Sequence, residues 1–210
     1  MVLPEEFVEV RVRARPMAPD DRRDAIIEAV IPLLLEHGRD VSTKRIAQAA
    51  GIAEGTVFRA FGDKESLIRA AVARHFDPLP LRTRLSGIDH DLPLEQKIAE
   101  IITALRDRLS GVIRLMAALG GDAPGAPDPR ADERGPDADW IDILDELVER
   151  DRERLAVGIP ELAFYLRLVA FGAAVPQFNA PHEFGPAELA AFVIGGVLHH
   201  SPAGDPRTHG

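Results

Sequence analysis

One stretch, IAQAAGIAEGTVFRAFGDKESL at 46–67, constrains the fold more than any other part of the chain. Its pattern predicts two short helices, over 44–50 and 54–60, separated by a turn at Gly51. Ala47 is small enough for the two helices to cross closely. Their shared seam is filled by Ile46, Ile52, Val57 and Phe61. Two short helices joined by a glycine-containing turn are typical of a helix-turn-helix, whose second helix enters the DNA major groove.

Helical patterns continue on both sides of this stretch. The apolar residues over 21–37 fit one helix, in which Pro32 predicts a bend or a displaced apolar face. After the helix-turn-helix, Asp63 or Gly62 begins a third short helix that runs towards Phe76. The front of the chain therefore predicts a helical head built around a three-helix DNA-binding unit.

The rest of the chain reads as a helical body. A continuous apolar stripe predicts its longest helix over 92–121, preceded by a Pro-rich connector with a single short helix at 77–87. An amphipathic helix is expected over 140–157. Two nearly all-apolar helices, over 161–175 and 186–200, are expected to pair with a second copy of the chain as a four-helix interface. No strand pattern or internal repeat appears, so the predicted fold class is all-α.

Charge and composition limit the function classes. The net charge of −9 alone argues against nucleic-acid binding, yet acidic and basic residues balance over 1–75, so the acidic excess lies in the body. The chain has no Cys, which excludes disulfides and thiolate metal sites and makes the cytoplasm the default location. It also shows no signal peptide and no apolar run long enough for a membrane span, so no membrane partner is expected.

The segment VSTKRIAQAAGIAEGTVFRAFGDKESL at 41–67 resembles the signature of the TetR/AcrR family of bacterial transcriptional regulators. The resemblance extends over about 21–76. Its matching positions are Thr43, Ile46, Ala47, Ala50, Gly51, Gly55, Phe61, Lys64 and Leu67. It implies a flexible N-terminal arm at 1–19, a DNA-binding domain at 20–76, and a ligand-binding and dimerisation domain at 77–210.

The resemblance also implies a function. A homodimer would bind a pseudo-palindromic double-stranded DNA operator, repress transcription, and be released by a small hydrophobic effector. The family implies no cofactor and no enzymatic activity. This agrees with the absence from the sequence of GxSxG, GxGxxG, P-loop and HExxH motifs and of a Cys nucleophile.

The DNA-contacting residues are expected on the face of the second helix opposite Val57 and Phe61, and at the adjoining helix starts. The candidates are Thr43, Lys44, Arg45, Glu54, Gly55, Thr56, Phe58, Arg59 and Lys64. Two positions depart from the family pattern. Ala53 replaces the usual capping Ser, so Glu54 has to favour the helix start through the helix dipole. Phe58 replaces a Tyr, so one phosphate contact fewer is expected per half-site.

The effector site is expected among the body helices, because the 92–121 helix is apolar on more than one side. The candidate lining residues are Leu105, Leu109, Ile113, Met116, Trp140 and Phe164. Trp140 follows a Pro/Gly-rich segment at 122–139 that is expected to be a mobile loop. Few charges fall on these apolar lines, so a neutral, lipophilic effector is expected.

Some alternatives stay open at this stage. Arg11, Arg13 and Arg15 form either an arm that enters the minor groove or a disordered tail. The cluster of His199, His200 and His209 is not expected to bind a metal, because adjacent helical residues point about 100° apart. The alternative function is a helical dimeric interaction protein, or a small-molecule-binding protein, that binds no operator.

Overall fold

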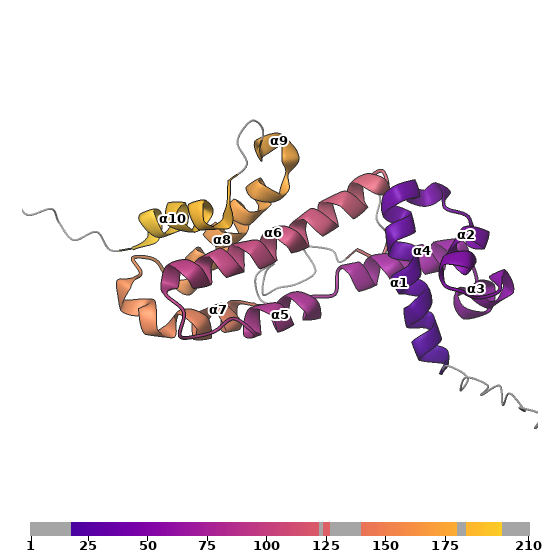
Figure 1. Ribbon diagram of the computed structural model, residues 1–210, viewed down its shortest axis with the longest axis horizontal. Helices are drawn as coiled ribbons and strands as arrows, with labels where there is room; N and C mark the ends of the chain where they lie inside the picture. The colour runs from indigo at the N-terminus through magenta and orange to yellow at the C-terminus, as the bar shows by residue number, and fades with distance from the viewer. Residues whose placement is uncertain (1–17, 122–123, 127–139, 180–183, 199–210) are drawn as a thin grey trace, which may run out of the picture.

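The computed structural model describes residues 18–121, 124–126, 140–179 and 184–198. Every regular element in these residues is a helix, apart from an isolated antiparallel bridge between Leu155 and Leu198. The predicted all-α class is confirmed. Figure 1 shows an elongated molecule, with α1–α4 forming the head at one end and α5–α10 forming the body.

The head consists of four helices with well-defined starts. They are α1 (Pro19–His37), α2 (Thr43–Ala49), α3 (Glu54–Phe61) and α4 (Lys64–His75), with a 3-10 turn at Gly38–Asp40 after α1. The Ser42 hydroxyl accepts from the backbone N–H of Arg45 at 3.3 Å, and the Asp63 carboxylate accepts from the N–H of Ser66 at 2.6 Å. Because these caps satisfy donors that have no intrahelical partner, they fix where α2 and α4 begin. Pro32 lies inside α1, which continues through it as one helix.

The body is built around one long helix. Its helices are α5 (Leu79–Ser86), α6 (Leu94–Ala118), α7 (Ile141–Val148), α8 (Ile159–Ala174), α9 (Pro176–Asn179) and α10 (Pro186–Val197). The helix α6 packs against α8 and α10, and it runs from the body to the head (Figure 1). Near the end of α6, Leu115 lies in the same buried cluster as the head core, as does Leu119 just beyond it. The head is therefore anchored on the central helix of the body.

The predicted length of the helix that begins near Trp140 is wrong. The expected helix over 140–157 ends as an α-helix at Val148 and continues only as a 3-10 helix over Glu149–Arg154. Lys97 of α6 is almost completely buried, and its ammonium donates to the carbonyl of Leu147 at 2.9 Å and to the Asp151 carboxylate at 3.2 Å. A carbonyl bonded to this ammonium is drawn away from the regular α-helical ladder, and the buried charge has to be paired.

Other predicted features fall outside the described residues or concern the whole chain. The N-terminal arginines, the 127–139 part of the expected loop, and His199, His200 and His209 lie outside the described residues. Among the helices that the structure describes, none is long and apolar enough to cross a lipid bilayer.

Candidate nucleic-acid interface and effector cavity

The turn between α2 and α3 has the geometry that the sequence predicts. Gly51 has a φ of +66°, a left-handed conformation that favours glycine. The N–H of Ile52 donates to the carbonyl of Ala47 at 3.0 Å, which closes the turn. On the seam between the helices, Ile46, Ala47, Val57 and Phe61 are buried and Ile52 is half-buried. This seam fixes which face of α3 remains outside.

The outer face of α3 carries a pre-positioned arginine. Glu54, Gly55, Phe58 and Arg59 are exposed, and Thr56 is half-buried. The Arg59 guanidinium donates to the Thr56 hydroxyl at 3.2 Å, and its Nε donates to the Gly55 carbonyl at 3.3 Å. These bonds hold the cation along its own helix, which restricts the freedom of its side chain.

A hydrogen bond joins the starts of α2 and α3. The Thr43 hydroxyl donates to the Glu54 carboxylate at 2.5 Å. Ala53 occupies the capping position of α3 in an extended conformation, and it has no side-chain oxygen to offer. Glu54 is the acidic residue of the first turn, where a carboxylate is favoured by the helix dipole. The structure thus places Thr43 and Glu54 together, and this pairing was not part of the sequence prediction.

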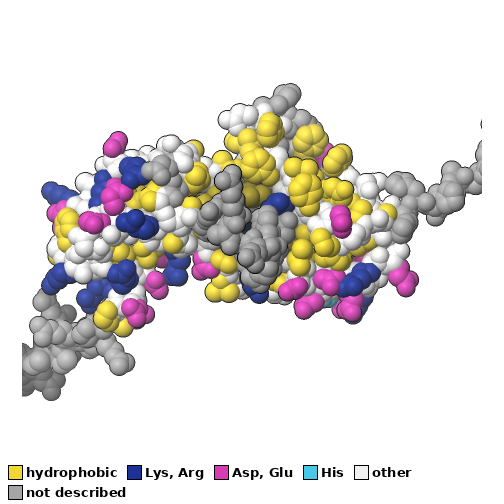
Figure 2. Space-filling view, turned by 180° about the vertical axis from the view of Figure 1, so that it is seen from behind, with side chains coloured by type: hydrophobic (Ala, Val, Ile, Leu, Met, Phe, Trp, Pro, Cys, Tyr) yellow, Lys and Arg dark blue, Asp and Glu magenta, His cyan; other side chains and the backbone are white. Residues whose placement is uncertain are grey.

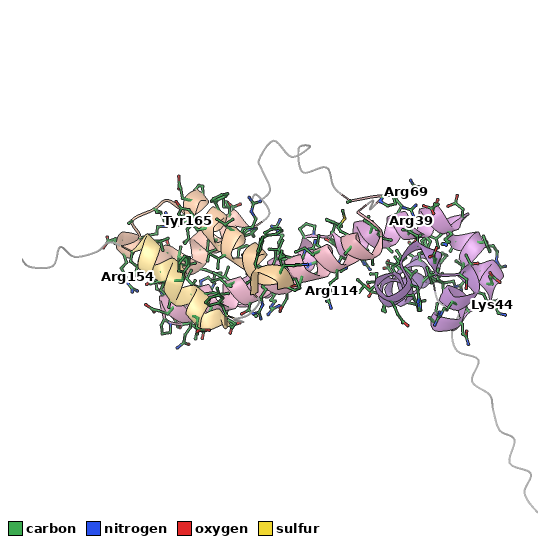
Figure 3. The ribbon with its side chains drawn as sticks, turned by 90° about the horizontal axis from the view of Figure 1, so that it is seen from above. Arg39, Lys44, Arg69, Arg114, Arg154 and Tyr165 are labelled. Atoms are coloured by element: carbon green, nitrogen blue, oxygen red, sulfur yellow. The ribbon has the colours of Figure 1, made fainter. Side chains whose placement is uncertain are left out.

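The remaining predicted DNA contacts are lysines and an arginine at helix starts. Lys44 and Arg45 are exposed in the first turn of α2, and Lys64 is half-buried at the start of α4. Figure 3 shows Lys44 at the outer end of the head, far from the body residues Arg154 and Tyr165. This end of the molecule is therefore free of the body and accessible to a long duplex.

The sequence prediction missed a basic hollow between α1 and α3. It has a volume of about 360 Å³ and is lined by Pro19, Arg22, Arg23, Thr56, Arg59 and Ala60. Arg23 donates to the Ala60 carbonyl, and its guanidinium lies 4.3 Å above the ring of Phe61. The adjacent basic pair at 22–23 was the available signal, but helical periodicity alone did not place it beside Arg59.

Two adjoining hollows lie in the body, and they share Leu109 and Arg167. The first hollow, which we call the effector cavity, has a volume of about 170 Å³. It is lined by Phe76, Pro78, Leu81, Leu105, Arg108, Leu109, Trp140 and Arg167. The second hollow has a volume of about 340 Å³ and is lined by Leu109, Phe164, Arg167, Leu168 and Phe171. Of the predicted lining residues, Ile113 and Met116 are half-buried further along α6 towards the head.

Arg108 joins the effector cavity to the end of α4. Its guanidinium donates to the carbonyl of His75, the last residue of α4. The imidazole of His75 lies against Gly111 of α6, where an added Cβ would come within 3.2 Å of Nε2. Burial lowers the pKa of His75, and nearby Arg108 and Arg114 lower it further, which favours the neutral imidazole. The head and body thus meet through a tightly packed polar junction.

The body also presents an exposed aromatic face. It consists of Phe164, Tyr165, Leu168 and Phe171 of α8 and Phe192 of α10. Figure 2 shows hydrophobic side chains gathered over this part of the body. A hollow of about 620 Å³ lies between the two helices beside Tyr165, Phe192, Gly195 and Gly196. By contrast, Leu162, Leu166, Val193 and Val197, which lie on the two helices expected to pair with a second copy, are buried within the chain.

Comparisons with known proteins find a family match within the head. Residues 26–71 match a family model described as bacterial regulatory proteins, tetR family. Over 60 residues the chain is 38% identical to YvkB of Bacillus subtilis (strain 168), an uncharacterised HTH-type transcriptional regulator. This match covers 28% of the chain and 31% of YvkB, less than a third of that relative.

Solved structures resemble the chain over most of its length. A transcriptional regulator of Rhodococcus sp. Rha1 has a TM-score of 0.58 at 18% identity, covering 85% of this chain and 99% of that one. A TetR transcriptional regulator of Streptomyces coelicolor has a TM-score of 0.53 at 23% identity, with coverage of 85% and 99%. NalD, the secondary repressor of the MexAB-OprM multidrug efflux pump in Pseudomonas aeruginosa, has a TM-score of 0.50 at 24% identity, with coverage of 87% and 99%. These similarities show the fold over the 85–87% of this chain that they cover.

Proposed function

We propose that this chain is a member of the tetR family of bacterial regulatory proteins, and that it is a ligand-responsive, sequence-specific DNA-binding repressor and not an enzyme. The observation that carries the proposal is the outer face of α3, where Arg59 is held by Thr56 and Gly55. In this proposal residues 1–19 form an arm, 20–76 the DNA-binding domain, and 77–210 the ligand-binding and dimerisation domain. The protein acts in the cytoplasm on double-stranded DNA.

The DNA contacts divide into two kinds. Thr56, Arg59 and Glu54 face outward on α3 and read base edges in the major groove. Lys44, Arg45 and Lys64 contact phosphates, which fixes the register of the head on the duplex. Thr43, Gly55 and Phe58 complete the contact surface, with Phe58 supplying apolar contact where a hydroxyl is absent.

The repressor acts as a homodimer through the aromatic face. Five large apolar side chains are exposed on two neighbouring helices, and they form a patch whose exposure to water is unfavourable. Pairing α8 and α10 with the same helices of a second copy buries this patch by two-fold symmetry. The operator is then pseudo-palindromic, with half-sites separated by one helical turn or a multiple of it.

A small hydrophobic effector that binds in the body releases the operator. The effector cavity adjoins the end of α4, and α4 belongs to the head core, so a shift of α4 relative to α6 moves the two copies of α3 apart or together. The effector has to bind the released conformation better than the DNA-bound one, because equal affinity for both would shift nothing.

Titration of the full-length protein with DNA fragments from beside its own gene tests the proposal. Fluorescence anisotropy is expected to show one fragment bound at least about 10³-fold more tightly than a shuffled fragment at the same salt concentration. The Arg59→Ala variant should lose about 1–3 kcal/mol of this difference. Equal affinity for both fragments would mean a helical dimeric interaction protein, or a small-molecule-binding protein, without operator binding.

A further inference from the structure

We propose that the effector is a small organic acid, an aryl or branched-chain carboxylate whose acid group binds the guanidinium of Arg108. This inference rests on the proposed function, since it names the chemical class that the effector cavity selects. It departs from the neutral effector expected from the sequence, because the structure places two arginines in the apolar cavity wall.

The wall of the effector cavity combines apolar surface with positive charge. Phe76, Leu81, Leu105 and Trp140 supply the apolar surface, while Arg108 comes from α6. Arg167 reaches the same cavity from α8, and its guanidinium also lies 6.0 Å from the centre of the Phe164 ring. A ligand that satisfies this wall needs an apolar body and an acid group, and a planar carboxylate matches the fork of a guanidinium.

Arg108 lacks an anionic partner within the part of the chain that the structure describes. Its guanidinium is half-buried and donates to the His75 carbonyl, and none of the described carboxylates lies within ion-pair distance of it. Burial lowers the pKa of Arg108, and Asp77 opposes this only from a distance. A partly desolvated cation is unfavourable without a counter-charge, so a bound carboxylate would compensate it.

The size of the effector cavity limits the acid. The volume of the cavity is about 170 Å³. It is smaller than the sites of about 300–1,000 Å³ that hold drug-sized ligands. A single ring or a short branched chain with one carboxylate fits this space, with further room towards the hollow that shares Leu109 and Arg167.

Binding at Arg108 also provides a route to the head. The same guanidinium that would receive the carboxylate donates to the last carbonyl of α4. A carboxylate held by two parallel N–H groups competes with the single carbonyl for these donors. Loss of that bond frees the end of α4. His75, the last residue of α4, packs closely on Gly111, so a shift of this end has to move its imidazole. The acid would thus bind the conformation in which the junction is open.

Matched pairs of probes test the ligand class on the full-length protein. The probes are benzoate with benzamide, and phenylacetate with phenylacetamide. Because Trp140 is the single Trp of the chain and lines the effector cavity, its fluorescence reports binding directly. We expect each acid to bind at least about tenfold more tightly than its amide, since the amide forms no charge-assisted pair.

Variants of α6 then locate the acid group. Arg108→Gln is expected to remove the preference for acids while amide binding stays within about twofold, and Arg108→Lys is expected to keep a reduced preference because it retains charge without the fork. Arg106→Gln, on the same helix and outside the effector cavity, is the control and should behave like the unchanged protein. If Arg108→Gln fails to fold, the Arg108→Lys variant and the matched probes still decide the question.

The outcomes separate this inference from the proposed repressor function. Equal binding of acids and amides, or no saturable binding of any acid at millimolar concentration, would overturn the carboxylate proposal, and sequence-specific DNA binding in the same preparation would leave the repressor function in place. An acid preference that Arg108→Gln removes, with operator affinity unchanged by the acid, would uphold the ligand class and overturn release by this ligand. Acid binding that lowers operator affinity supports both, because the two binding events are reciprocal.

Discussion

The head and the body of this protein use the same element, the amphipathic helix, and end with opposite surfaces. The head closes its core around Ile26, Leu34 and Leu67 and leaves charged side chains outside. The body buries a larger core along α6 and still leaves five large apolar side chains exposed on α8 and α10. The difference fits the proposed homodimer, in which the head is complete as one copy and a second copy covers the aromatic face of the body.

The largest expected effect comes from breaking the aromatic face. Phe192 of this face is 74% exposed, so Phe192→Glu should leave the chain folded while it prevents two copies from pairing. Operator affinity should then fall by roughly 10²–10⁴-fold, because two heads that are no longer joined in one dimer bind their half-sites independently and lose the gain in avidity. Sedimentation and fluorescence anisotropy measure the two effects together.

The matched control for this change is Gln96→Glu, which adds the same charge at an exposed polar position of α6. It should leave both assembly and operator affinity unchanged. If the Phe192→Glu protein remained a dimer with full operator affinity, the aromatic face would not be the dimer interface and the comparison between head and body would fail.

The next effect concerns base recognition by the head. Arg59→Ala removes the cation that Thr56 and Gly55 hold on the outer face of α3. Affinity for the operator should fall by about 1–3 kcal/mol relative to a shuffled fragment, which is the usual value of one specific base contact. Selection from a random DNA pool should show relaxed preference at one position of each half-site. Arg69→Ala, exposed on α4, is the control, and an equal loss in both variants would contradict the assignment of this face.

A smaller and sequence-independent effect is expected at Lys44. This side chain is exposed at the outer end of the head, and we proposed above that it contacts a phosphate (Figure 3). Lys44→Ala should weaken binding to all fragments alike and reduce the salt dependence of the binding constant by about one. Affinity measured across a series of salt concentrations gives this slope. A changed order of preference among fragments, with an unchanged slope, would instead make Lys44 a base contact.

The smallest expected effect is a gain in stability at the start of α3. Ala53 is extended at the capping position, so Ala53→Ser adds an acceptor for the free N–H groups of the first turn. The free energy of unfolding should rise by about 1 kcal/mol, and the melting temperature by roughly 2–4 °C. Ala49→Ser, exposed at the end of α2, gives no new cap and should not stabilise the protein. Equal melting temperatures for both variants would show that Glu54 and Thr43 already satisfy this helix start.

Much of the head could be predicted because its information is local. The turn at Gly51, the small Ala47, and the caps at Ser42 and Asp63 are all set by residues within one or two helical turns of each other. The pairing of Thr43 with Glu54 was missed, although both residues had been singled out, because it depends on how α2 and α3 cross. Spacing along a helix assigns a side chain to a face, but it does not assign a partner on another helix.

In the body the prediction of helices succeeded, while the assignment of their surfaces did not. Leu162 and Val193 looked equivalent to Phe164 and Phe192 in nearly all-apolar helices, and only packing separated the buried pair from the exposed pair. A helix that is apolar on nearly every side contains no sequence signal for which side meets its own chain and which meets a partner.

By itself, the sequence determined the all-α class, the helix-turn-helix and the polar outer face of α3, because periodicity, capping and glycine conformation act over a few residues. The tertiary structure alone decided that Lys97 bonds to the Leu147 carbonyl near the end of α7, that Arg108 and Arg167 line an apolar cavity, and that Arg108 bonds to the end of α4. Each of these arrangements brings together residues more than 30 positions apart in the sequence: Lys97 with Leu147, Arg108 with Arg167, and Arg108 with His75. Their energies depend on burial and on charge pairing. Neither quantity exists until the helices have packed.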